Sequence, residues 1–209
     1  MVRSLFSVAV LVSLAGLISA ASAQEKNELT VLLGRTFVSD HASVNTSTPG
    51  ALLTSGAGLS LEANYGRRLL DLDLVGLTAE LPFVVNFGEN VHYPANLTPK
   101  DYKSFVVTPS LRANLFPNAG ISPWVSVGGG LGYFKANSTL EFGGTNPGDT
   151  GTTTGIFQIG AGFDVKLLSS LSVRAEARDF YAGVPQLNVD IGKSRQHNIF
   201  VGAGVVFRF

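Results

Sequence analysis

The sequence predicts an all-β fold, in which eight amphipathic strands run up and down and close into an antiparallel barrel that crosses a membrane. Three observations support this prediction. Apolar residues recur at every second position in segment after segment, which is the periodicity of a strand with one apolar face. The connections between these segments are alternately long and short. Beyond the amino terminus no apolar run reaches the length of a transmembrane helix, so a membrane protein of this sequence must cross with strands.

The amino terminus indicates export from the cytoplasm. Arg3 is followed by the apolar run LFSVAVLVSLAGLISA and then by the small residues Ala21, Ser22 and Ala23, which form a cleavage site. The apolar run is too short for a membrane anchor, and it is followed by small residues rather than by a stop-transfer flank. We therefore expect residues 1–23 to be a cleaved signal peptide and residues 24–209 to form one barrel domain.

Eight period-2 segments follow, and each is about as long as a strand that crosses a bilayer at a tilt. We expect strands near residues 28–38, 56–68, 75–87, 104–115, 123–135, 154–167, 171–181 and 197–209. Two prolines fall inside them, and each removes a hydrogen-bond donor from the sheet. We expect a bulge, or a misplaced strand limit, at Pro82 and Pro109.

The two faces of each strand differ in chemistry. The apolar face carries a charge only near strand ends, at Arg35 and Arg67. The other face carries threonine, serine, glycine and charged residues. A basic residue on a lipid face costs about 2–4 kcal/mol at the bilayer midplane and about 0–1 kcal/mol near the interface. This distribution favours lipid, rather than a protein core, as the contact of the apolar face.

The connections indicate which strand ends share a rim. The long ones follow the first, third, fifth and seventh strands, and the short ones are LLDLDL, PNAGIS and LSS. In an up-and-down barrel this alternation places all long loops at one rim and all tight turns at the other.

Taken together, the signal peptide, the eight strands, the alternating connections and the terminal Phe209 with Phe207 resemble the small bacterial outer-membrane β-barrel family of the OmpA, OmpX and opacity-protein type. The resemblance implies a place in the outer membrane, in contact with its lipid, with the long loops outside the cell. It also implies that the barrel-assembly machinery recognises the last strand through Phe209 and Phe207, with Val205 and Val201 as supporting apolar positions.

The polar face predicts a closed interior. An eight-stranded barrel is only wide enough for its own side chains, which argues against a general diffusion pore. Charges inside such a lumen are tolerated only when they are paired. We therefore expect a network of ion pairs among residues of the polar face, namely Glu62, Glu80, Arg112, Asp164, Lys166, Arg174, Glu176, Arg178 and Arg208. Glycines on the same face are expected to leave room for the arginines.

Composition excludes several other functions. The 15 basic residues balance the 15 acidic ones, which argues against a nucleic-acid partner. The absence of cysteine removes thiolate metal sites. The three histidines, His41, His92 and His197, fall at the long-loop rim without a dense ligand motif, so we expect no metal and no cofactor.

The sequence therefore predicts a non-enzymatic envelope scaffold or surface-interaction protein. Its long loops contain apolar residues that suit binding of an extracellular ligand, namely Tyr93, Tyr102, Phe142, Leu187 and Val189.

Two alternatives stay open. A lipid A deacylase-type hydrolase would use Ser194 and His197 with Asp190 or Asp179 as the acid. A soluble lipocalin-like carrier would show the same alternation with the apolar face turned inward.

Overall fold

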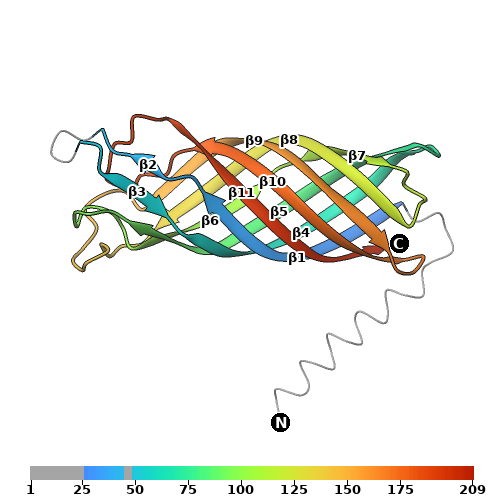
Figure 1. Cartoon of the computed structure of the whole chain (residues 1–209), viewed down its shortest axis with the longest axis horizontal. Coiled ribbons are helices and arrows are strands. Elements are labelled where there is room, and N and C mark those ends of the chain that lie inside the picture. Colours follow the sequence, from blue (N-terminus) through green and yellow to red (C-terminus); the bar gives the residue numbers. More distant parts are fainter. Residues whose placement is uncertain (1–25, 45–48) are drawn as a thin grey trace, which may run out of the picture.

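The computed structural model describes residues 26–44 and 49–209, and the expected signal peptide lies outside the described residues. The strands form a tall barrel in which each runs obliquely to the long axis (Figure 1). No helix in the described part of the chain is long and apolar enough to cross a membrane. The structure has strands β1 (Asn27–Val38), β2 (His41–Ala42), β3 (Leu52–Ser55), β4 (Ala57–Asp71), β5 (Val75–His92), β6 (Asp101–Val107), β7 (Ser110–Leu115), β8 (Ile121–Ala136), β9 (Gly151–Lys166), β10 (Leu171–Gly183) and β11 (Arg195–Arg208).

Eight strands form the barrel wall, which confirms the predicted fold class. β6 and β7 lie end to end and together make one wall strand between β5 and β8, while β2 and β3 extend the rim beside β5. All neighbours in the ring are antiparallel, in the order β1, β4, β5, β6 with β7, β8, β9, β10 and β11. The ring closes where β1 pairs with β11, from Glu28 opposite Arg208 to Val38 opposite Asn198.

All eight expected strands are present, but several extend further toward the long loops. β5 continues to His92 rather than ending near residue 87, and β6 begins at Asp101 rather than near residue 104. The first long connection also contains β2 and β3, which no period-2 segment of the sequence predicts. The inward side chains of these extensions are buried, so the alternation does continue there. The register shift between Asn86 and Glu89 interrupts the period in β5, and in β6 the charged residues Asp101 and Lys103 flank Tyr102.

The expectation of a bulge at the two prolines is wrong, whereas that of a misplaced strand limit holds at Pro109, where the strand expected over 104–115 is divided into β6 and β7. β6 and β7 are interrupted at residues 108 and 109, but the register with β5 is the same on both sides, with Phe83 opposite Val107 and Glu80 opposite Ser110. The backbone amide of Thr108 still donates to the carbonyl of Pro82 at 3.2 Å. Each proline therefore removes a donor without shifting the register. The register shifts of β5 lie elsewhere. In the pairing with β4 the shift is between Arg68 and Leu70, and in the pairing with β6 it is between Asn86 and Glu89.

The two faces of the wall lie as the alternation predicts. Leu131 and Val125 on the outer face are 62% and 60% exposed, whereas Arg174 and Arg178 on the inner face are fully buried. Arg35 and Arg67 are exposed on the outer face. A soluble carrier needs the opposite arrangement, because its apolar face lines the ligand cavity. The large apolar surface is the one that lipid covers in a barrel of this kind.

The depth dependence of the lipid face can be tested on β8. Val127 lies between Ile121 at the turn end and Tyr133 near the loop end, and all three are exposed on the outer face. We expect Val127→Lys to lower the free energy of unfolding by about 2–4 kcal/mol and Ile121→Lys by about 0–1 kcal/mol, because the ammonium group reaches water from the rim but not from the midplane. Urea titration of the protein folded into lipid vesicles measures both values. Equal losses for the two variants would contradict a lipid-facing outer surface.

Candidate functional site

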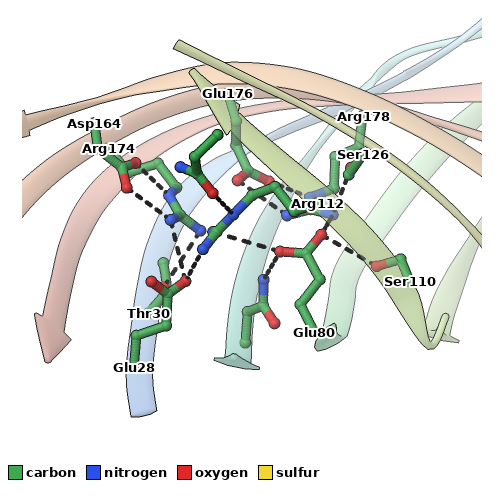
Figure 2. Close-up of polar contacts among 12 residues, drawn as sticks. Glu28, Thr30, Glu80, Ser110, Arg112, Ser126, Asp164, Arg174, Glu176 and Arg178 are labelled. Atoms are coloured by element: carbon green, nitrogen blue, oxygen red, sulfur yellow. Dashed lines mark hydrogen bonds and ion pairs between the residues drawn. The ribbon is translucent and has the colours of Figure 1, made fainter. Parts of the chain in front are cut away.

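A layer of charged side chains converges in the lumen (Figure 2). It lies toward the tight turns, because Glu28, Asp164 and Arg208 stand near the strand ends on that side. Every charged member of this layer points inward from a wall strand, and none is more than 12% exposed at its side chain. The layer contains four guanidinium groups and five carboxylates, those of Arg112, Arg174, Arg178, Arg208, Glu28, Glu62, Glu80, Asp164 and Glu176.

Arg178 of β10 occupies one end of the layer. Its guanidinium contacts three carboxylates, at 2.8 Å from Glu80 Oε1, 2.5 Å from Glu176 Oε1 and 3.5 Å from Glu62 Oε2. Glu80 also accepts a hydrogen bond from Ser110 Oγ at 3.1 Å. Because these carboxylates come from β4, β5 and β10, Arg178 joins strands on opposite sides of the barrel.

The other end of the layer is built around Arg174 and Glu28. Arg174 binds Asp164 with two parallel hydrogen bonds of 2.7 and 2.9 Å and reaches Glu28 Oε1 at 3.2 Å. Glu28 also pairs with Arg112, whose Nη1 lies 3.4 Å from Glu80 Oε2 and so connects the two ends. Arg208 of the last strand adds a 2.8 Å contact to Asp164.

Trp124 of β8 lies in the middle of the layer and is almost completely buried. The guanidinium groups of Arg112, Arg174 and Arg178 lie 5.6, 5.2 and 5.2 Å from its ring centre, within the range of cation–π attraction. A Cβ on Gly162 of the neighbouring strand would lie 2.6 Å from this ring, so only glycine leaves room for it. With Trp124 included, all eight wall strands contribute a side chain to the layer.

The structure does not bring every expected residue into this layer. Lys166 is exposed at the end of β9, where it lines a small hollow at the turn rim with Arg68 and Arg208, and it forms no ion pair within the described residues. Two members were missed by sequence reasoning. Glu28 lies directly opposite Arg208, so the register of the closing strands would have found it. Trp124 has inward parity, but the sequence gives no sign that arginines surround it.

The lumen is not polar throughout. On the loop side a cluster of buried apolar side chains lies beside polar inward residues such as Asn86, Glu89 and Asn198, and the loops place further apolar residues over it. Phe134, Phe180 and Phe200 are at most 2% exposed, although they come from three different wall strands. The expected ion pairs therefore do not fill the whole interior, because a cluster of buried apolar side chains, the apolar layer, lies in the loop half.

The long loops pack against each other over this apolar layer. Tyr93, Tyr102 and Leu187, which the sequence analysis placed on a binding surface, are buried beneath the loops, whereas Phe142 is 60% exposed. The loop after β8 reaches the loop after β5 through Glu141, which pairs with His92 and accepts a 3.0 Å hydrogen bond from the amide of Tyr93. The loops thus form one connected cap.

The catalytic set of the alternative deacylase hypothesis is only half assembled. His197 Nδ1 lies 2.6 Å from Asp179 Oδ2 on the outer face of the barrel, beside the ring of Tyr181 at 4.8 Å. No hydrogen bond connects the Ser194 hydroxyl to His197 within the described residues, and Asp190 accepts instead from the amide of Gly192. The pair has an acid and a base but lacks an aligned nucleophile.

The histidines also do not gather around a metal. In residues 26–44 and 49–209 no three His, Cys, Asp or Glu side chains converge as ligands would. His92 and His197 each face a single carboxylate. His41 is largely buried under the loops, and this burial, together with the positive charge of Lys193, lowers its pKa.

The fold and its filled lumen define a small closed transmembrane barrel, and comparison with known sequences identifies the family. Residues 6–209 match the family model of the outer membrane protein beta-barrel domain, so the chain belongs to this family. A search of curated protein sequences found no match.

Solved structures with the same fold are also outer-membrane proteins. Neisserial surface protein A is 15% identical with a TM-score of 0.54, covering 88% of this chain and 97% of that protein. OprG from Pseudomonas aeruginosa is 14% identical with a TM-score of 0.56, covering 89% of this chain and 97% of its own. AlkL is 12% identical with a TM-score of 0.51, covering 91% and 94%. At these identities the similarity establishes the fold alone.

The importance of the charged layer can be tested with Arg178→Met. We expect a loss of about 3–5 kcal/mol in the free energy of unfolding, because the substitution leaves three buried carboxylates without their shared partner. The matched control is Lys166→Met, which removes a positive charge from the same expected set but from an exposed position, and it should leave the urea midpoint in vesicles unchanged. Equal destabilisation by both variants would contradict the prediction that the buried charged layer stabilises the barrel.

Proposed function

We propose that the protein is a non-enzymatic scaffold of the outer membrane that presents a preformed loop surface outside the cell. The observation that carries this proposal is the closed lumen. The charged layer and the apolar layer lie one above the other, and their side chains are buried. A solute would have to separate buried ion pairs to pass, which is costly in a low-dielectric interior.

The connected loop cap supports a role in surface interaction. Hydrogen bonds link the loops after β5, β8 and β10, among them Phe142 N to Asn96 Oδ1 at 3.0 Å and Asn188 Nδ2 to Leu97 O at 3.0 Å. A surface held this way loses little conformational entropy when a partner binds. Phe142 is exposed on it beside the ring of His92, with ring centres 6.3 Å apart.

One preparation tests both parts of the proposal, the closed lumen and the absence of enzymatic activity. Residues 24–209 are refolded into phosphatidylcholine vesicles that contain lipid A. We expect no ion leakage above protein-free vesicles, because both layers block the lumen, and no change in the mass spectrum of the extracted lipid A. A large open porin in the same vesicles is the positive control for leakage.

The second readout separates the proposed function from the deacylase hypothesis, which the His197–Asp179 pair favours. Release of an acyl chain from lipid A that disappears in both Ser194→Ala and His197→Ala would replace the scaffold proposal with a hydrolase. Steady leakage through the wild type would instead indicate a pore.

We also propose that Phe209 and Phe207, with Val205 and Val201, form the signal for the barrel-assembly machinery. The rings of Phe207 and Phe209 are stacked with centres 5.9 Å apart. The backbone of Phe209 exchanges hydrogen bonds of 2.9 and 3.0 Å with Asn27, so the last residue takes part in closing the ring.

Replacing the terminal ring tests this signal. We expect Phe209→Ser to lower the amount of protein in the outer membrane several-fold, while refolding in detergent stays efficient because the backbone pairing is kept. Phe142→Ser is the control, since it removes the same ring from a loop. Quantitative immunoblots of outer-membrane fractions measure both. Unchanged levels for Phe209→Ser, or an equal loss for both variants, would exclude the signal.

A further inference from the structure

The outer face of the barrel carries two lysines that oppose each other. Lys103 of β6 and Lys135 of β8 are directly paired in the register of these strands. Both are exposed, and both point away from the lumen, since their neighbours Ser104 and Phe134 are buried on the inner face. We propose that these lysines bind the phosphorylated head group of a lipid in the outer leaflet.

The lysine pair is unfavourable without an anion. Directly opposed side chains in a sheet have Cβ atoms about 4.5–5.5 Å apart, and like charges at that separation destabilise the pairing. Among the pairings of the described strands no other lysine or arginine faces another. Asp101 lies beside the pair, but its carboxylate accepts from Asn137 Nδ2 at 3.2 and 3.3 Å, and neither lysine forms an ion pair within the described residues.

The depth of the pair matches a lipid head group. The next opposed pair toward the membrane is Phe105 and Tyr133, whose stacked rings have centres 6.5 Å apart. The pair after that is Val107 and Leu131, both exposed and apolar. Aromatic residues mark the membrane interface on the outside of such barrels. The lysines therefore lie just beyond the interface, on the side of the long loops.

The surface between the strands has room for a ligand. A hollow of about 420 Å³ is lined by both lysines together with Asp101, Phe105, Asn137 and Thr150, so that two ammonium groups face a single carboxylate. β9 places Gly151 opposite Lys135, and a Cβ there would lie 3.0 Å from the hydroxyl of Tyr133. The absence of a side chain at residue 151 thus lets the phenol extend to the level of Lys135. The two lysine ammonium groups are the charged donors that line the hollow itself.

This combination favours a lipid over a free anion. A phosphate monoester presents several acceptor oxygens to the donors, which a dissolved phosphate would do equally well. An acyl chain of the same molecule would in addition pack along Phe105 and Leu131, which face the hydrocarbon region. A membrane-anchored phosphate gains both contacts, so we commit to that source.

The experiment measures lipid binding to the detergent-solubilised barrel by native mass spectrometry. The probes are lipid A with its phosphates, the same lipid dephosphorylated, and inorganic phosphate alone. We expect Lys103→Gln and Lys135→Gln each to weaken binding of the phosphorylated lipid about tenfold, the usual effect of losing one charge-assisted contact. The control is the double variant Arg67→Gln with Lys166→Gln, which removes two positive charges near the turn ends of the strands and should bind like the wild type.

Thermal melting gives an independent readout. In detergent without the lipid, Lys103→Gln should melt at a higher temperature than the wild type, because the repulsion is relieved. Adding the phosphorylated lipid should stabilise the wild type more than the variant. Equal binding by all variants, or equal binding of the dephosphorylated lipid, would overturn the proposal. Stabilisation by inorganic phosphate at the same concentration as the lipid would replace the lipid with a soluble anion.

Discussion

The rest of this structure depends on the requirement that every backbone donor in a lipid environment finds a partner within the protein. Strands meet it only when the sheet has no free edge. The pairing of β1 with β11, which extends to the terminal Phe209, removes that edge. The constraint is strict enough that the interruption between β6 and β7 keeps its register, although Pro82 and Pro109 each remove a donor there.

Closure with eight strands dictates what the interior can contain. The lumen is narrow, so long side chains from opposite sides of the wall contact each other. A charged group buried there is costly unless an opposite charge lies beside it. Arg178 and Arg174 satisfy this condition by each contacting carboxylates from more than one strand. Trp124 fills the space that remains between the arginines. The charged layer thereby connects all eight wall strands. The apolar layer lies on its loop side, where the loops cover it and exclude water.

Much of this architecture could be predicted from the sequence, because alternation reports the face on which a side chain lies. It placed Arg112 and Arg174 inside and Arg35 outside without any knowledge of neighbours. Alternation says nothing about depth or partners. Lys166 has inward parity but lies where the strand leaves the enclosed lumen, so it ends in an open hollow. The partners of Glu28 follow from the register of β1 with β11. The sequence does not specify this register unless the geometry of the turns is known.

The order of residues on the outer face extends the same reasoning to the membrane. Moving along β8 from Leu131 through Tyr133 to Lys135, the surface changes from apolar to aromatic to charged, and β6 follows the same order from Val107 through Phe105 to Lys103. Two strands that carry this order in register form a surface matched to each level of one leaflet. The inner charges are neutralised by the protein itself, whereas the opposed lysines outside are not. The proposed lipid phosphate would supply the counter-charge that the described residues do not give to this pair.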